Sequence, residues 1–182
     1  MAFNSIWGKH VCTPRDLITN ELEDAPNAWK LMQETEEQFS LVYYSQSHSF
    51  HTDFPCFHAK RTNLFEMEKE ATYRYGYLKG TQMKKDDKQV KLDKTDEAYP
   101  YKNEFSVDVN HEGDVIRQDF QIIYTDYRWC AILYSYNLGY QVWVQSTYLE
   151  TNRKIPRLCT FIYDLMVPRG TKFIVYKWKV CP

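Results

Sequence analysis

The residues of this chain best suited to covalent chemistry are its five cysteines: Cys12, Cys56, Cys130, Cys159 and Cys181. An odd number permits two cross-links and leaves one thiol over, and Cys12, in the polar segment at the start, is the natural one to stay free or to bridge a dimer. Two cross-links in a chain that is almost wholly β after Trp29 favour a closed barrel. A small closed barrel has room for one small ligand, so we expect capture rather than catalysis.

Two other groups of side chains could bind a metal: His48, His51, Cys56 and His58, and Asp108, Glu112 and Asp114. The cysteine of the first group is expected in a disulfide, and a pair of neutral surface histidines is commoner than a metal site. The second group lies near a predicted turn and lacks the spacing of a calcium loop. No glycine-rich phosphate loop, G-x-S-x-G sequence or pair of carboxylates stands out. We therefore expect no metal, no cofactor and no enzymatic activity.

Composition favours a single β-rich domain. The chain has 182 residues, enough for one substantial core, and its 15 Tyr, 10 Phe and 5 Trp favour pleated structure and a concave aromatic site. The net charge of −1 provides no electrostatic footprint for nucleic acid or an acidic membrane. No apolar run is long enough to insert in a membrane as a helix, and the first residues lack the features of a secretory signal. If the protein is secreted, we expect this to be the mature form, with Met1 added for expression.

Hydrophobic periodicity divides the chain into a polar N-terminal arm, residues 1–25, and one domain, residues 26–182. The domain is expected to begin with a short helix over 26–36 that presents Trp29. Alternation with a period of two then predicts strands at Gln38–Gln46, Phe54–Thr62, Glu66–Gly80, Tyr101–Asn110, Val115–Thr125, Trp129–Tyr136 and Tyr140–Ser146. The lysine- and acid-rich residues 81–98 are expected to form a solvated hairpin rim.

The pattern returns to a helix after Pro156, and Gly170 follows the end of this helix. Its apolar stripe is expected at helical spacing, at Leu158, Phe161, Ile162 and Leu165. A final strand, Lys172–Val180, is predicted to lead to the last cysteine.

These features together resemble one known family. The sequence Ala28-Trp29-Lys30, the strand with Phe54-Pro55-Cys56, the two cysteines around a hairpin, the helix after it and the near-terminal cysteine are similar to those of the tick salivary lipocalins, the histamine-binding-protein family. The resemblance implies a mainly β fold: an eight-stranded antiparallel lipocalin barrel with a short N-terminal helix and a C-terminal helix. It also implies the disulfides Cys56–Cys181 and Cys130–Cys159. Members are secreted in saliva at the bite site, where they sequester host mediators of inflammation and immunity.

The residues at the family's amine-binding positions differ from the usual ones. Amine-binding members have Asp directly after the first hairpin cysteine and an acid before a hydrophobic-aromatic pair, whereas this chain has Cys130-Ala131-Ile132 and Gln141-Val142-Trp143. A third family acid falls on Gln121. A buried ammonium without a carboxylate is very costly. Neutral walls rich in aromatic rings therefore favour an apolar or amphipathic ligand, such as a fatty acid, a leukotriene or a sterol.

The residues expected to line the cavity occupy alternating strand positions, if the inward positions of the family carry over. They are Phe105, Val107, Gln121, Ile123, Ala131, Leu133, Gln141 and Trp143, with Tyr43 and Tyr75. A ligand carboxylate would require a cation near the mouth, and the candidates are Arg74, Arg117 and Arg128, of which Arg128 is included in the predicted site.

Two alternatives remain open. An amine could be bound by other acids, namely Glu66, Glu68, Glu70, Asp108 or Asp126. The barrel could instead be a scaffold whose loops bind a host immune protein, with the lysine-rich rim at 84–94 as the obvious surface.

Overall fold

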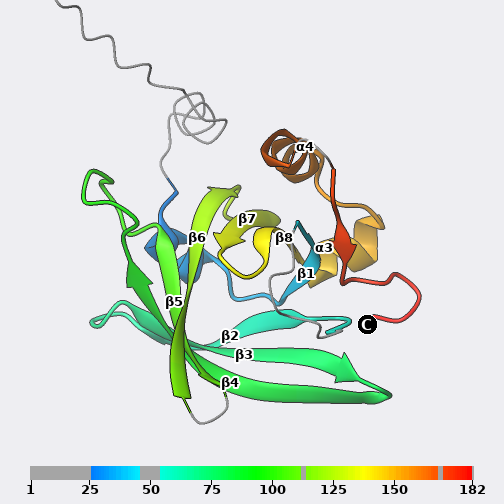
Figure 1. Cartoon of the computed structure of the whole chain (residues 1–182), viewed down its shortest axis with the longest axis horizontal. Helices are drawn as coiled ribbons and strands as arrows, with labels where there is room; N and C mark the ends of the chain where they lie inside the picture. Colours follow the sequence, from blue (N-terminus) through cyan, green and yellow to red (C-terminus); the bar gives the residue numbers. More distant parts are fainter. Residues whose placement is uncertain (1–25, 46–53, 112–113, 168–169, 182) are drawn as a thin grey trace, which may run out of the picture.

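The computed structural model describes residues 26–45, 54–111, 114–167 and 170–181. Cys12, His48, His51 and Glu112 lie outside the described residues, as does the polar arm expected at 1–25. The described chain is a mainly β domain with three helices (Figure 1).

The domain is built around a closed barrel of eight antiparallel strands (Figure 1). In chain order the strands are β1 (Phe39–Tyr44), β2 (His58–Phe65), β3 (Glu70–Lys79), β4 (Gln82–Asp93), β5 (Glu104–His111), β6 (Asp114–Thr125), β7 (Cys130–Ser135) and β8 (Gly139–Gln145). Each strand pairs with the next, and β1 closes the barrel by pairing with both β2 and β8. A two-residue strand, β9 (Phe173–Ile174), pairs with the end of β1. The predicted lipocalin-type barrel is therefore confirmed.

Three helices lie against this barrel. The first, α2 (Ala28–Glu34), begins at Asn27, whose side chain accepts a hydrogen bond from the backbone N–H of Lys30 at 3.0 Å, a typical N-cap. Its buried residues belong to the cluster that fills the barrel, so α2 covers one end of it. The other two, α3 (Ser146–Asn152) and α4 (Arg157–Met166), follow β8, and α4 packs against β6, β7 and β8 (Figure 1). The short N-terminal helix and the C-terminal helix were both predicted, whereas α3 was not.

Apolar side chains form two clusters on opposite faces of the barrel wall, because successive strand residues point to opposite faces. The inner cluster includes Leu41, Val90, Leu92, Ile122, Leu133 and Trp143. The outer cluster, between the wall and α4, includes Val42, Tyr43, Ile132, Val142, Ile162 and Tyr163. Membership of one cluster or the other thus shows which side chains face the interior.

Two disulfides connect the barrel to the C-terminal part of the chain. Cys56 is bonded to Cys181, and Cys130 at the start of β7 is bonded to Cys159 in α4. Both pairings implied by the family resemblance are confirmed. Because Cys130 and Cys159 are fully buried, their bond lies within the outer cluster and holds α4 on the wall.

The buried face of α4 differs from the predicted one. Of the four residues in the predicted stripe, Ile162 is buried, whereas Leu158, Phe161 and Leu165 are exposed. The buried residues of α4 are Cys159, Ile162, Tyr163 and Met166. The prediction of the buried face is therefore wrong. The helix carries apolar residues on two faces, and the one that packs against the barrel is the face that contains Cys159, which is bonded to β7.

Two strand predictions also need correction. Residues 82–93 form the long strand β4 rather than a rim, because pairing with β3 along nine residues provides backbone hydrogen bonds that charged side chains do not prevent. The final strand predicted at Lys172–Val180 is only the two-residue β9, since Phe173 and Ile174 alone among these residues form ladder pairs with β1.

Candidate ligand-binding site

One end of the barrel is held shut by α2 and by Arg61 of β2. The side chain of Arg61 is only 9% exposed. Its Nη1 donates to the backbone carbonyl oxygens of Met32 and, at 3.1 Å, of Gln33, and its Nη2 pairs with the Glu36 carboxylate at 3.1 Å. Carbonyls in the last turn of a helix have no partner within the helix. Arg61 supplies partners for two of them and so attaches α2 to the wall.

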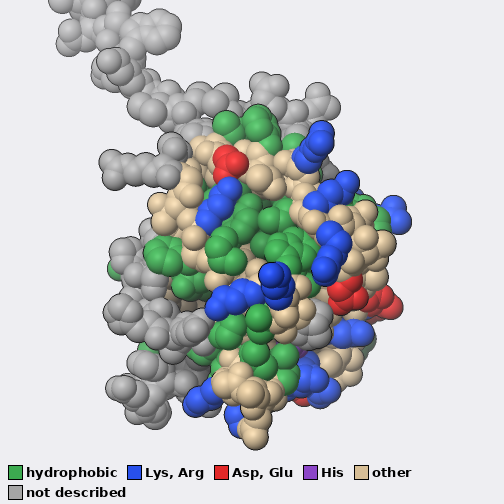
Figure 2. Space-filling model, turned by 90° about the vertical axis from the view of Figure 1, so that its right-hand side faces the viewer, with side chains coloured by type: hydrophobic (Ala, Val, Ile, Leu, Met, Phe, Trp, Pro, Cys, Tyr) green, Lys and Arg blue, Asp and Glu red, His purple; other side chains and the backbone are tan. Residues whose placement is uncertain are grey.

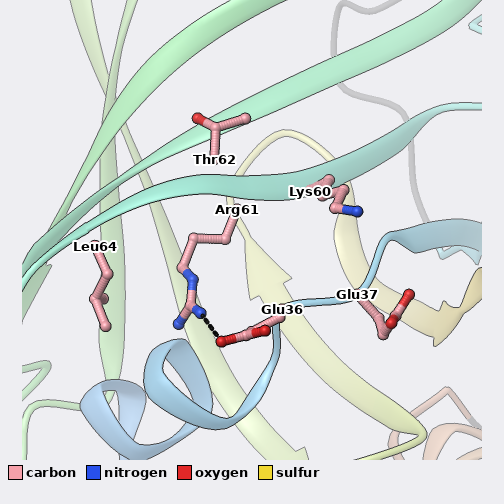
Figure 3. Close-up of a pocket in the computed structure, with 6 residues that line it drawn as sticks. All are labelled: Glu36, Glu37, Lys60, Arg61, Thr62 and Leu64. Atoms are coloured by element: carbon pink, nitrogen blue, oxygen red, sulfur yellow. Dashed lines mark hydrogen bonds and ion pairs between the residues drawn. The ribbon is translucent and has the colours of Figure 1, made fainter.

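A pocket opens on the outside of this attachment (Figure 3). It is lined by Glu36, Glu37, Lys60, Arg61, Thr62 and Leu64, with the ion pair between Arg61 and Glu36 at its centre. Most of its lining is charged or polar, so this pocket does not suit an apolar ligand.

The interior next to α2 is apolar. Residues paired across antiparallel strands share a face, and the paired positions here bring large apolar side chains together on the inside. These pairs are Phe105 with Leu92 and Phe120, Val107 with Val90, Ile122 with Leu133, and Trp143 with Leu41 and Ala131. An apolar ligand next to this wall would contact apolar side chains.

Gln141 is a fully buried polar residue on the inner face. It is paired with Leu133 and lies two positions before Trp143 on β8. Its Nε2 donates to Ser135 Oγ at 2.9 Å, and its Oε1 accepts from Trp143 Nε1 at 3.1 Å. Both ends of the amide are therefore satisfied within the wall, which is uncharged at this position.

A row of aromatic rings leads from Trp143 toward the end of the barrel formed by β3 and β4. The ring of Phe57 contacts that of Trp143 edge-on, with centroids 5.7 Å apart, and stacks on Tyr75 at 5.9 Å. Tyr75 donates from its hydroxyl to Asp86 Oδ2 at 3.1 Å. Burial and the nearby Asp86 raise the pKa of Tyr75 to about 12, so its hydroxyl keeps its proton at neutral pH.

Lys88 of β4 is, like Arg61, a cation on the inner face of the barrel. It is paired with Tyr73, a member of the inner cluster, and lies two positions before the inward residue Val90. Its side chain is half-buried, and it forms no ion pair or hydrogen bond with another residue in the described part of the chain. On the same face of β4, Asp86 and Lys84 continue the row toward the end of the strand.

The predicted cavity residues divide between the two faces. The inner face holds Phe105, Val107, Ala131, Leu133, Gln141, Trp143 and Tyr75. The outer face holds the other three of the strand positions: Gln121, Ile123 and Tyr43. This differs from the expected inward orientation, because Ile122 is an inward residue of β6, so its neighbours Gln121 and Ile123 point to the opposite face and Ile123 packs in the outer cluster. A second shift, between Leu41 and Tyr43, turns Tyr43 to the outer cluster.

The three arginines considered for a ligand carboxylate have other partners. Arg74 is bonded through two nitrogens to Asp87 on the outside of the barrel. Arg117 pairs with two carboxylates, also outside. Arg128 is exposed and lies 4.3 Å from the ring centre of Trp129. The interior cation Lys88 was missed, although alternation along residues 82–93 was a signal that could have identified it once that segment was taken as a strand.

The acids considered for an amine do not face the interior. Glu66 and Glu68 are exposed in the turn between β2 and β3, and Glu70 accepts a hydrogen bond from Gln89. Asp108 is exposed, and Asp126 accepts from three backbone N–H groups of its own turn, at 2.7 to 3.0 Å. Among the described side chains, the exposed Asp86 lies on the same face of β4 as Lys88 and was not among the acids predicted.

Two kinds of site were searched for among the described residues. No three His, Cys, Asp or Glu side chains in those ranges are placed to hold a metal ion. No helix within them is long and apolar enough to cross a membrane.

A closed eight-stranded antiparallel barrel with an apolar interior, one end covered by a helix, defines the lipocalin class of ligand-binding proteins. This chain belongs to the tick histamine-binding protein family: the family described as "Tick histamine binding protein" matches residues 18–182. It is a family of binding proteins and not of enzymes. No curated protein sequence matches the chain.

Solved structures share the fold. AM182, solved in complex with serotonin, superposes with a TM-score of 0.66 at 16% sequence identity, covering 87% of this chain and 95% of that one. Insecticyanin from the tobacco hornworm Manduca sexta superposes with a TM-score of 0.62 at 10% sequence identity, with 82% of each chain covered. The siderocalin Ex-FABP superposes with a TM-score of 0.51 at 14% sequence identity, covering 75% of this chain and 86% of that one.

Proposed function

We propose that this protein is a secreted tick salivary lipocalin that sequesters a small hydrophobic host mediator in its barrel and thereby suppresses inflammation or immunity. The observation that carries the proposal is the division of the interior: an apolar cluster of side chains beside α2, and beyond it the half-buried Lys88 without a partner among the described residues. A ligand with an apolar body and one anionic end matches both parts. Within the class of fatty acids, leukotrienes and sterols, this favours the first two.

The neutral wall around Gln141 supports an apolar ligand body. The family's amine carboxylates are replaced at this wall by Ala131 and Gln141, and the Gln141 amide is already satisfied by Ser135 and Trp143. An ammonium placed there would lose its hydration and gain no counter-ion, which is strongly unfavourable.

Lys88 supports the anionic end. A hydrogen bond between ammonium and carboxylate contributes about 1.5–3 kcal/mol when it is shielded from water. Tyr73, the residue paired with Lys88, has its pKa raised to about 12 by burial, so at neutral pH its hydroxyl is a donor rather than a negative charge. The two side chains together favour an oxyanion.

An amine is the second candidate, favoured by Asp86. This carboxylate accepts from Tyr75, whose ring stacks on Phe57, and a carboxylate beside aromatic faces suits an organic cation. AM182, which has the same fold, was solved with serotonin. Against this candidate, Asp86 lies between Lys84 and Lys88 on one face of β4, so the row has more positive than negative charge.

The test compares ligands that differ only in the charge of the head group, by titration calorimetry of delipidated protein. Oleate is expected to bind more tightly than oleyl alcohol. Lys88→Met is expected to lower the affinity for oleate about tenfold and to leave the affinity for oleyl alcohol unchanged. Lys91→Met is the matched control, because Lys91 is exposed on the opposite face of β4.

Three results would contradict these statements. If the Lys88→Met variant bound oleate as tightly as the unchanged protein, Lys88 would not be the residue that binds the anionic end of the ligand. Absence of binding to fatty acids, leukotrienes and sterols, together with no lipid in an organic extract of the purified protein, would reject the proposed function. Tight histamine or serotonin binding that is lost in Asp86→Asn would establish the second candidate.

A further inference from the structure

Exposed apolar side chains are concentrated on one surface. Eleven large apolar residues are exposed in the described chain, and six of them lie between positions 158 and 180. They are Leu158, Phe161 and Leu165 of α4, Phe173 and Ile174 of β9, and Val180. Each is between 43% and 59% exposed, so packing inside the described domain leaves about half of each side chain uncovered.

Contacts between α4 and the segment with β9 make these residues one surface. Asp164 of α4 pairs with Lys172 at 2.8 Å, and Tyr163 donates from its hydroxyl to the carbonyl oxygen of Thr171 at 2.7 Å. Phe173 stacks on Tyr44, with ring centroids 5.2 Å apart. The exposed edge of α4 therefore continues into β9, and we call this surface, with residues 150–181 around it, the α4 face.

The charge of the α4 face is opposite to that of the rest of the chain. The described residues between 150 and 181 include six Lys or Arg and two Asp or Glu, although the whole chain has a net charge of −1. One of the two acids, Asp164, is neutralised by Lys172. The basic residues Arg153, Lys154, Arg157, Lys177 and Lys179 are all exposed. Figure 2 shows a band of apolar side chains on this side, bordered by Lys and Arg.

We propose that the α4 face adsorbs to anionic phospholipid surfaces. Exposed Phe, Leu and Ile side chains enter the boundary between head groups and acyl chains, while surrounding Lys and Arg are attracted by the negative surface potential. Adsorption of this kind requires no membrane-spanning element. A low net charge does not oppose it, because the attraction depends on the charges within a Debye length of the lipid.

A second copy of the chain fits this surface less well. A two-fold dimer would place the same surface on both sides of the interface, so the five exposed basic residues of each copy would lie in one interface with those of the other. Like charges held together in this way cost affinity. A lipid surface covers the same apolar residues and neutralises the cations.

The test is co-sedimentation of the full chain with vesicles of phosphatidylcholine alone and with about one third phosphatidylserine. We expect binding at least about tenfold tighter to the anionic vesicles, weakening as salt is added. Phe161→Ser with Leu165→Ser is expected to lower binding to them about tenfold. Ile116→Ser, at an exposed position of β6 outside the α4 face, is expected to change nothing.

Several results would overturn the proposal. Equal binding to both vesicle types, or an equal loss in Ile116→Ser, would reject it. A dimer in sedimentation velocity that dissociates in the Phe161→Ser, Leu165→Ser variant would assign the α4 face to a second copy instead. Since the replaced residues are exposed, unchanged thermal unfolding of each variant is expected and shows that the folded proteins are being compared.

Discussion

Replacing Arg61 with Met is expected to loosen the closed end of the barrel. The substitution keeps most of the apolar stem but removes the guanidinium that joins β2 to the last turn of α2. Hydrogen bonds from a charged donor contribute about 1.5–3 kcal/mol each when shielded. The bond to Gln33 is exposed to solvent, so water replaces it after the substitution, whereas the bond to Met32 is partly buried. We therefore expect a loss of about 3 kcal/mol in the free energy of unfolding.

The partner of Arg61 provides the control. Glu36 is 83% exposed, and an ion pair with such a residue contributes at most about 1 kcal/mol. Glu36→Gln should therefore lower the free energy of unfolding far less than Arg61→Met does. Urea unfolding followed by fluorescence measures both, and an unchanged denaturant slope would show that the same unfolding reaction is compared. A loss below about 1 kcal/mol in Arg61→Met, or an equal loss in both variants, would refute the reasoning.

Three further outcomes are expected. Cys130→Ala with Cys159→Ala should lower the free energy of unfolding by about 3.5 kcal/mol, from the sequence separation of 29 and the chain-entropy relation, and an unchanged thermal midpoint would contradict this. Gly76→Ala should cost about 1–3 kcal/mol, because the new Cβ would lie 2.7 Å from His58 Nε2, and His58→Ser should restore part of the loss in urea unfolding. Stability should fall between about pH 10 and 12, because the pKa of Tyr73 is 10 in the unfolded chain and about 12 in the folded protein; Tyr73→Phe should reduce this fall, and an unchanged fall in this variant would contradict it.

The strands in the second half of the barrel were the most predictable elements. The segment Trp129–Tyr136 was predicted and Cys130–Ser135 is observed, because alternating apolar residues bounded by turn residues define such strands locally. The disulfide pairing came from the family resemblance, since cysteine positions alone allow several pairings.

Other features depend on tertiary contacts that local patterns do not contain. Residues 158–166 carry apolar side chains on two faces of α4, and only the bond between Cys159 and Cys130 decides which face is buried. In β6, Gln121 and Ile123 were expected inside because the inward positions of the family were taken to carry over, and the apolar residues on both faces of this strand do not decide the orientation locally. The register shift between Leu41 and Tyr43 is a property of the pairing of β1 with β8, and one displaced residue reverses the orientation of those that follow, here Tyr43.

Closure of the barrel through β1 has a consequence for the order of folding. The hydroxyl oxygens of Ser40 and Ser146 lie 2.9 Å apart although 106 positions separate these residues. The pairing of β1 with β8 must therefore wait until β8 has been made, and such distant contacts slow folding. Hairpins β5–β6 and β7–β8 have near neighbours and are able to form first, together with the bond between Cys130 and Cys159. The bond between Cys56 and Cys181 spans 125 positions, so closing it joins parts of the chain that are still farther apart than β1 and β8.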